Sequence, residues 1–467
     1  MSQAHKTNHM KFSMLKSKIL FVVTVLSATV TFSQKQWTLK ECVEHALEKN
    51  ITIEQNKLSV ELAKEDAEIA KGNFLPSLGG NVSNSMNFGL TVGADNVRSS
   101  AERYVLSLGL SGNGTIFNGF RNTNTYKRAK LGIETSVLDL KVIENNVSLQ
   151  VVNSYLNVLF AKENLAAAKV QFEISSKQIE AAQKSFEAGT IPKGDLLNAQ
   201  STAATDAQNV VSQENALDLA LLNLAQLIQV PSEGFDIAPV DVGTPSSTLM
   251  YSNSDIVYQK SLLTQPQIAR ATKFIEDADF NIEIQKGAFM PSLTYSFGAS
   301  TFYNTVLGQP DFISGMTPNG IPFEIDNRIS KQLFENNLNY QIGLNLSIPI
   351  FNRFQTKNRV ERAVISKKVA ETRLENEKLN LEQTIEQAYL DVKTALKAYE
   401  AAKTSLEAQE EAFKNAQERF NFGALSVFDF ELVRTRLVNA QATMIRSKFD
   451  YVFKTKVLQF YSGELEF

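Results

Sequence analysis

The chain has few of the residues on which most enzyme chemistry depends. Its 467 residues include one cysteine, Cys42, and three histidines, His5, His9 and His45. A single cysteine excludes a disulfide framework and a cysteine-ligated metal cluster. His5 and His9 lie in a segment that we expect to be removed, so only His45 would remain for acid–base chemistry. We therefore predict that the protein is not an enzyme, needs no cofactor, and has a structural or conducting role.

The chain also has little net charge and few glycines and prolines. The 47 Lys and Arg face 50 Asp and Glu, so the basic excess of a nucleic-acid-binding protein is missing. The 22 Gly and 11 Pro are too few for a disordered chain. No phosphate loop, catalytic triad, zinc motif or nucleotide fingerprint is found. Cys42 and His45 are three residues apart, but two ligands make an incomplete metal site, and we expect them to pack in a core.

One long apolar run stands near the beginning of the chain. Residues 19–32 carry no charge, Lys11, Lys16 and Lys18 precede them, and small residues lie just before Gln34. This layout predicts a secretory signal peptide over residues 1–33, whichever of Met1, Met10 and Met14 is the true start. The run is shorter than the roughly 20 residues of a membrane-spanning helix. No later segment has the pattern of such a helix, so an exported chain could enter a membrane only through strands.

The rest of the sequence is written twice. AKGNFLPSL (70–78) returns as QKGAFMPSL (285–293), and TIFNGFRNTNTYKRA (115–129) returns as PIFNRFQTKNRVERA (349–363). We predict a first repeat over residues 34–230, a polar linker over 231–255 and a second repeat over 256–467. The second copy is longer around residues 309–327, where we expect a turn-rich loop between two strands.

Each copy predicts the same order of elements: a helix of about 35 residues, two strands and a long helical hairpin. Apolar and polar residues alternate in four segments, which predicts strands at about 77–92, 104–116, 292–303 and 338–350. The hairpins are expected at 119–230 and 353–460. Between Arg121 and Glu187 there is no Pro and one Gly, and apolar residues in both hairpins recur at intervals of three and four, which predicts coiled-coil packing.

The composition of the strands favours a membrane barrel over a soluble sandwich. Their polar face carries small uncharged residues in place of the Lys and Glu of most soluble sheets. Four strands cannot close a membrane barrel, because the smallest have eight. An open edge in lipid would leave unpaired backbone groups at a cost of several kcal/mol each. The barrel must therefore be shared between copies, with two copies giving eight strands and three giving twelve.

A duplicated hairpin with the motif G-x5-D at each turn, Gly189/Asp195 and Gly423/Asp429, resembles the outer membrane efflux protein family, the TolC-like outer membrane factors. The segment TLKECVEHALEKN (38–50) is similar to the opening helix of that family. The resemblance covers residues 37–467. It implies an α+β membrane protein of the Gram-negative outer membrane that extends into the periplasm. The fold implied is a homotrimer whose twelve-stranded β-barrel continues into an α-helical coiled-coil tunnel.

The same resemblance implies a function and partners. The chain would be the passive exit channel of a tripartite efflux pump or a type I secretion system. Its partners would be outer-membrane lipid, a periplasmic adaptor protein and an inner-membrane pump of the RND, ABC or MFS type. The sequence leaves the cargo and the class of pump open. A second hypothesis is a periplasmic coiled-coil scaffold or adaptor without a membrane barrel, which would be extracted without detergent.

The resemblance also implies the site residues. Asp429 takes the place of an aspartate that rings the constriction of the tunnel, and Asp195 is its counterpart in the first copy. Leu432 and Leu425 stand where the family has a second aspartate and a locking arginine. The adaptor-docking candidates lie at the hairpin tips: Phe186, Gly189, Ile191, Phe420, Phe422, Gly423 and Leu425. The alternatives are that Asp429 and Asp195 cap helices and that the apolar tip residues pack inside their own hairpins.

Overall fold

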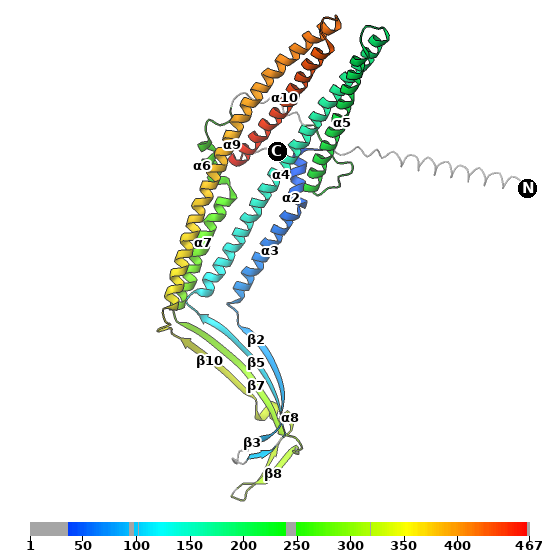
Figure 1. Ribbon diagram of the computed structural model, residues 1–467. Coiled ribbons are helices and arrows are strands. Elements are labelled where there is room, and N and C mark those ends of the chain that lie inside the picture. Colours follow the sequence, from blue (N-terminus) through cyan, green and yellow to red (C-terminus); the bar gives the residue numbers. More distant parts are fainter. Residues whose placement is uncertain (1–35, 93–97, 101, 240–248, 318, 465–467) are drawn as a thin grey trace, which may run out of the picture. The chain divides into compact units, whose positions relative to one another are not determined.

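The computed structural model describes residues 36–92, 98–100, 102–239, 249–317 and 319–464 (Figure 1). The expected signal peptide, residues 1–33, lies outside them. The chain forms two compact units. Of the described residues, one unit contains those up to Ile53, those within Glu144–Lys260 and those from Ile385 onward, and the other contains those within Glu54–Ile143 and Ser261–Thr384. The two longest helices contribute to both units, which are described in turn.

The second unit contains an antiparallel sheet of four strands in the order β10-β7-β5-β2. The strands are β2 (Ser77–Asn87), β5 (Arg103–Phe117), β7 (Ser292–Val306) and β10 (Asn339–Ser347). The two copies meet in the middle of the sheet, where β5 pairs with β7. The outer strands β2 and β10 each have one neighbour among the described strands, so each leaves a free edge (Figure 1).

The pairing register gives this sheet an apolar and a polar face. Val82 lies opposite Leu108, Leu106 opposite Tyr303, and Ile342 opposite Phe297. Because side chains alternate along a strand, the residues between them, mostly Ser, Asn, Gly and Gln, share the other face. The apolar residues of the outer strands are open to solvent, with exposed fractions of 74% for Val82 and 89% for Ile342. Among the described residues, nothing covers these side chains of the outer strands.

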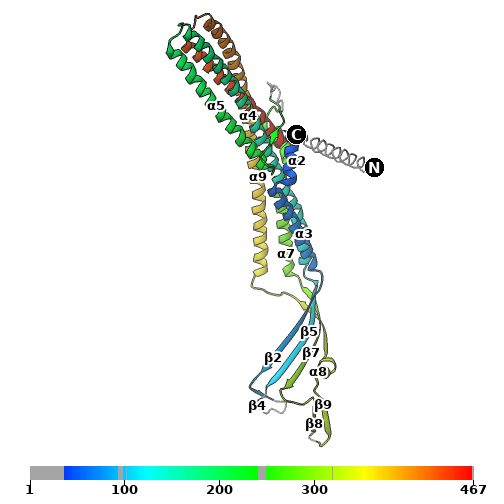
Figure 2. The ribbon, with the colours of Figure 1, turned by 90° about the vertical axis from the view of Figure 1, so that its right-hand side faces the viewer.

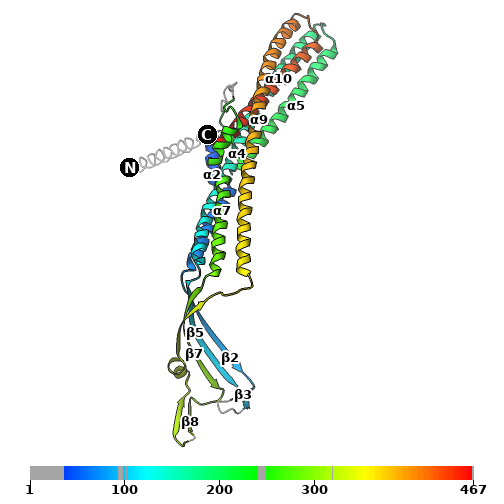
Figure 3. The same ribbon diagram turned by 90° about the vertical axis from the view of Figure 1, so that its left-hand side faces the viewer.

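A small hairpin occupies the segment where the sequence predicted a turn-rich loop. Strand β8 (Phe312–Met316) pairs with β9 (Pro322–Asp326) in the second copy, and β3 (Leu90–Val92) pairs with β4 (Arg98–Ser100) in the first (Figure 3). The expectation of a loop was wrong because the segment around Asn319-Gly320 has the residues of a tight turn. Gly320, with φ 79°, donates its N–H to the carbonyl of Thr317 (2.8 Å).

A short helical segment covers the edge of β7 beyond the end of β10. It consists of α8 (Ile329–Lys331) and a π-helical turn over Gln332–Asn336. The side-chain amide of Gln332 accepts a hydrogen bond from the N–H of Asn304 (3.0 Å) and donates one to its carbonyl (3.2 Å). This amide therefore takes the place of a neighbouring strand and protects the edge.

Each helix expected before the strands is divided in two. The first copy has α2 (Leu39–Lys49) and α3 (Ile51–Gly72), and the second has α6 (Ser254–Thr264) and α7 (Pro266–Lys286). Asn50 adopts an extended conformation, and its side chain accepts a hydrogen bond from the N–H of Thr52 and donates one to the carbonyl of Leu227. In the second copy, Pro266 lacks the N–H that a continuous helix would need.

Ion pairs join the helices of the sheet-containing unit. Arg128 of α4 (Arg121–Glu187) makes a bidentate pair with Asp277 of α7, with both N–O distances at 2.8 Å. Lys367 of α9 (Gln355–Asn421) pairs with Asp279 of α7 at 2.8 Å. Helix α7 thus contacts the starting portions of both long helices.

The first unit contains two helical hairpins. Helix α4 is followed by α5 (Lys193–Leu227), and α9 by α10 (Val427–Ser462) (Figure 2). Each of the long helices has 67 residues. Most of the apolar positions spaced at three and four are buried, among them Val152, Leu156, Leu159, Ile385, Val392 and Leu396. No helix in the described ranges combines the length and apolarity needed to cross a bilayer.

A two-stranded parallel ribbon lies against these helices. Strand β1 (Gln36–Trp37) pairs with β6 (Asp236–Ile237), at the far end of the first repeat. The buried hydroxyl of Tyr155 donates to the carbonyl of Ala238 (2.9 Å). Burial raises the pKa of this hydroxyl to about 12. The beginning and the end of the first copy are thereby fixed to α4.

Candidate gate and docking tips

Both hairpins turn through the same backbone motif. Gly189 and Gly423 have φ angles of 73° and 70°. The N–H of the residue after each glycine bonds to a carbonyl five residues earlier, Thr190 to Ser185 (2.9 Å) and Ala424 to Arg419 (2.8 Å). This is the Schellman termination of a helix, which needs a left-handed residue at the glycine position. A Cβ at either glycine would meet nothing within 4 Å, so the backbone conformation, and not space, requires glycine.

The two candidate gate aspartates lie just beyond these turns. The hydroxyl of Ser426 accepts the N–H of Asp429 (3.1 Å) and donates to its carboxylate (2.8 Å). Asp429 therefore takes part in capping α10, as the alternative interpretation predicted, and its side chain remains exposed. Asp195 is half-buried in the first turn of α5, whose N-cap residue Pro192 offers no side-chain hydrogen bond. A role of either carboxylate in gating stays a prediction.

The apolar residues at the tips divide into two kinds. Phe420 stacks on the buried ring of Phe430 with 4.6 Å between centroids, and the ring of Phe413 lies 5.6 Å from that of Phe430. Phe420 therefore packs inside its own hairpin. Phe422, in contrast, is 87% exposed. Phe186 is 36% exposed, and Ile191 and Leu425 are half-buried. Phe422 is thus the tip residue with the largest uncovered apolar surface.

A buried arginine that the sequence did not reveal joins the two hairpins. The side chain of Arg434 on α10 is 5% exposed and donates to Glu431, one turn earlier, at 2.8 Å. It also reaches Asp206 of α5 at 3.3 Å, and Gln171 of α4 donates to the same carboxylate at 3.4 Å. Asp206 and Arg434 are far apart in the sequence, so no local pattern could have indicated the pair. The residues of this hairpin junction are Gln171, Asp206, Glu431 and Arg434.

The hairpin junction lies in a polar surrounding. Serine and threonine side chains line the depression next to it, namely Ser201, Thr202, Thr205 and Thr435. Burial raises the pKa of the Glu431 carboxyl, although the neighbouring Arg434 favours its charged form. A buried ion pair adds little net stability by itself, but the loss of one partner leaves an uncompensated charge. The hairpin junction therefore ties α10 to α5 at a defined position.

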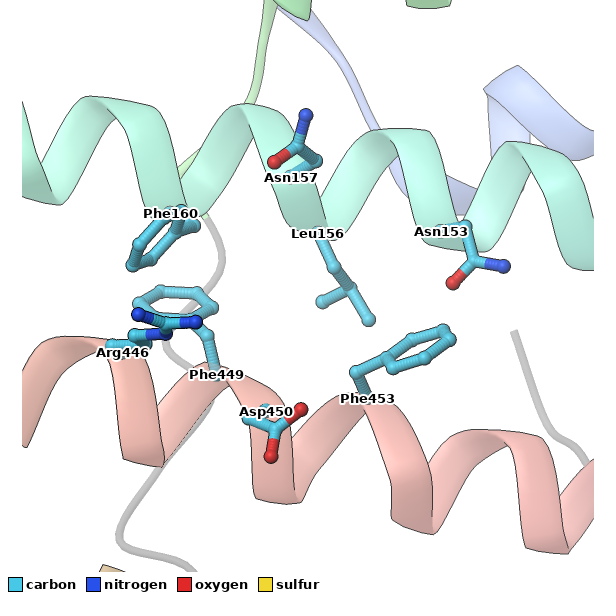
Figure 4. A pocket seen from close by; sticks show the side chains of 8 residues that line it. All are labelled: Asn153, Leu156, Asn157, Phe160, Arg446, Phe449, Asp450 and Phe453. Atoms are coloured by element: carbon cyan, nitrogen blue, oxygen red, sulfur yellow. The ribbon is translucent and has the colours of Figure 1, made fainter. Parts of the chain in front are cut away.

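A second depression lies between α4 and α10 (Figure 4). Asn153 and Asn157 line it from α4, and Arg446 and Asp450 line it from α10. The rings of Phe160 and Phe449, which also line it, meet edge to face with 6.1 Å between centroids. Apolar contacts between α4 and α10 thus hold the two hairpins together at a point farther from the start of α10 than the hairpin junction.

The described part of the chain contains no cluster of three or more His, Cys, Asp and Glu side chains suited to a metal ion. Cys42 is buried. The ring of His45 packs edge-on against Trp37 at 5.1 Å. The surroundings of both residues are those of a helix core.

Comparison with known proteins decides the family. The profile of the family described as "Outer membrane efflux protein" matches residues 42–229 and 257–463, one stretch in each copy. The chain belongs to the outer membrane efflux protein family. As a member of this family it is an outer-membrane efflux channel of the TolC-like type, and transport, not catalysis, is the family's activity.

Similar proteins support the assignment over nearly the whole chain. Outer membrane efflux protein BepC of Brucella suis biovar 1 is 20% identical over 97% of this chain and 90% of its own length. Alkaline protease secretion protein AprF of Pseudomonas aeruginosa is 20% identical over 73% of this chain and 67% of its own. The crystal structure of the Campylobacter jejuni CmeC outer membrane channel superposes with a TM-score of 0.72 at 20% identity, covering 92% of this chain and 86% of CmeC. The fold is thus that of the TolC-like channels.

Proposed function

We propose that three copies of this efflux protein form one closed barrel of twelve strands in the outer membrane, which continues into a helical tunnel through the periplasm. The channel is the passive exit of a tripartite efflux pump or a type I secretion system. The sheet carries the argument: it has four strands, an exposed apolar face and two free edges. A periplasmic scaffold would leave Tyr340 and Ile342 in water without a partner.

Closure follows from the strand order. The free edges belong to β2 and β10, and in lipid each unpaired backbone group costs several kcal/mol. If β10 of one copy pairs with β2 of the next, the arrangement is head to tail and closes into a ring. Each copy contributes four strands, so three copies supply twelve, the number that the resemblance implies.

The gate lies beyond the turn of the second hairpin. In a trimer, three Asp429 carboxylates would surround the axis, attract cations and repel anions. Leu432 and Leu425 remove the second acidic ring and the locking arginine that the resemblance implies. The hairpin junction of Arg434 offers another contact that could hold the resting arrangement, because it joins α10 to α5 within one copy.

The docking surface is the pair of hairpin tips, with Phe422 as its most exposed apolar residue. A periplasmic adaptor would cover these tips and connect the channel to an inner-membrane pump of the RND, ABC or MFS type. The names of the relatives include both efflux and protease secretion. We infer that the pump, and not this channel, selects the cargo.

Disulfide trapping between copies tests the closed ring. Ser83→Cys on β2 is combined with Gln341→Cys or Asn345→Cys on β10, all on the polar face. The native Cys42 is fully buried and does not interfere. Oxidation in membranes should give a covalent trimer for at least one pair, because β2 and β10 of adjacent copies lie about 5 Å apart.

The single variant Ser83→Cys serves as the control and should remain monomeric on denaturing gels. A protein that is extracted without detergent, or a monomer in every double variant, would contradict the proposal.

A further inference from the structure

Basic residues gather where the strands give way to the long helices. Residues 121–130, at the start of α4, contain four basic residues and no acidic one. Residues 353–362, which include the start of α9, contain four basic residues and one acidic residue, Glu361. Neither helix has an acidic residue in its first turn. Positive charge at a helix N-terminus opposes the helix dipole, so helix stability does not account for this distribution.

Most of these charges have no carboxylate partner within the described residues. Arg128 is the exception, because it pairs with Asp277. On the adjoining helix ends, Glu68 pairs with its neighbour Lys71 and Glu283 with its neighbour Lys286. The remaining side chains are exposed, and we call them the basic cluster: Arg121, Lys127, Lys130, Arg353, Lys357, Arg359 and Arg362.

Exposed apolar residues lie between the basic cluster and the sheet. All four connections between strand and helix meet at one end of the sheet, because Ser77 pairs with Asn113 and Ser292 with Ser347. Each connection carries large apolar side chains that are 43–95% exposed. We call them the aromatic belt: Phe74, Leu75, Phe120, Phe289, Met290, Ile350, Phe351 and Phe354.

The backbone of both copies is shaped to present this belt. Gly119 and Phe120 have φ angles of 70° and 61°, and Arg353 and Phe354 have 54° and 60°. A side chain is disfavoured in this left-handed region, yet the second copy places Arg353 there. In both copies the turn brings two phenylalanines edge to face, Phe117 with Phe120 and Phe351 with Phe354. The repeated turn therefore holds aromatic rings at the surface between sheet and helices.

We propose that the aromatic belt and the basic cluster together bind anionic phospholipid headgroups of the leaflet that faces the helices. This inference rests on the proposed function, in which the sheet spans the outer membrane. Apolar rings at the end of a spanning sheet lie at the boundary between acyl chains and headgroups. Ten residues of helix rise about 15 Å, so the cluster residues nearest the strands lie within a Debye length, about 8–10 Å, of the negative headgroup surface.

The neighbouring aromatic belt favours lipid over a water-soluble acidic polymer as the ligand. A polymer such as the peptidoglycan of the cell wall offers carboxylates to the basic cluster but nothing to cover Phe351 and Phe354. Anionic phospholipid supplies both negative charge and an apolar boundary. Its phosphate also matches the planar guanidinium groups of Arg353, Arg359 and Arg362.

The test counts the lipids that remain bound to the full-length protein purified in detergent, by native mass spectrometry with phosphatidylglycerol or phosphatidylcholine added. The wild type should retain phosphatidylglycerol in preference. Replacement of four cluster residues, Arg353→Gln, Lys357→Gln, Arg359→Gln and Arg362→Gln, should lower that preference at least about tenfold. The triple variant Arg121→Gln, Lys127→Gln and Lys130→Gln should lower it independently through the first copy.

The matched control removes four exposed basic residues from the same helix away from the sheet: Lys393→Gln, Lys403→Gln, Lys414→Gln and Arg419→Gln. It should keep the wild-type preference. Equal retention of both lipids by the wild type, or an equal loss in the control, would overturn the proposal. So would binding to purified cell-wall sacculi that disappears in the quadruple variant while lipid preference stays.

Conductance in a neutral planar bilayer separates this inference from the proposed function. A conducting protein without preference for phosphatidylglycerol refutes the lipid surface alone. Absence of conductance together with solubility in water refutes the channel.

Discussion

The tips of the two hairpins share a backbone but differ in their side chains. Both helices end in the same Schellman turn at a left-handed glycine. The first tip then has Ala188 and a proline N-cap without a side-chain hydrogen bond, whereas the second has the exposed Phe422 and the cap formed by Ser426. The two copies thus share the glycine that the turn requires and differ at the neighbouring positions. The second tip has become the place where packing, capping and the buried Arg434 come together.

The largest expected difference between the hairpins concerns Arg434. Arg434→Met leaves Asp206 and Glu431 without their counter-charge, which should destabilise the helical unit by on the order of 3 kcal/mol. The counterpart position in the first copy is the exposed Gln200, where Gln200→Met should change stability by less than about 0.5 kcal/mol. Thermal unfolding of the solubilised protein, followed by helical circular dichroism, measures both. Equal melting temperatures of the two variants would show that the hairpin junction does not stabilise the helical unit.

An intermediate effect is expected at the docking surface. Phe422→Glu should weaken adaptor binding by about 2 kcal/mol, the threshold of an interface hot spot. Because the ring is 87% exposed, folding should be unaffected. Ala188→Glu, at the counterpart position of the first tip, introduces the same charge and is the matched variant. Adaptor affinity and efflux in cells lacking the native channel report the result, and normal efflux with Phe422→Glu would show that the adaptor binds elsewhere.

The smallest effect is expected for the two aspartates. Asp429→Ala and Asp195→Ala should each cost only about 0.3–1 kcal/mol of helix stability. Single-channel recordings should nevertheless show that Asp429→Ala lowers cation selectivity and cation block more than Asp195→Ala does. Unchanged selectivity with Asp429→Ala would leave this carboxylate as a cap alone.

Much of the fold could be predicted because its signals are local. The absence of Pro between Arg121 and Glu187 sets the length of one helix, alternation marks the strands, and Gly189 and Gly423 mark the turns. The hairpin of β8 and β9 was missed although Gly320, the left-handed residue of its turn, was present in the sequence. The break of the first helix was hard to predict because the side chain of Asn50 is stabilised by the distant Leu227 carbonyl.

The candidate site was less predictable because it depends on contacts distant in sequence. The packing of Phe420 against Phe430 and the pairing of Arg434 with Asp206 require the two helices of a hairpin, or two hairpins, to be in place. Glu431 could be placed on a different helical face from Leu432, but nothing in its neighbourhood indicated burial. The basic cluster, in contrast, is visible in the sequence and gains meaning only once the strand ends are located.

The ribbon of β1 and β6 has a consequence for the order of folding. Its two strands are separated by the whole first repeat, and the hydroxyl of Tyr155 reaches the carbonyls of both Trp37 and Ala238. During export, β1 emerges some two hundred residues before its pairing partner β6. Contacts of such high separation form late and slowly. The first copy therefore remains without this ribbon until residues 236–237, at the beginning of the linker between the copies, have emerged.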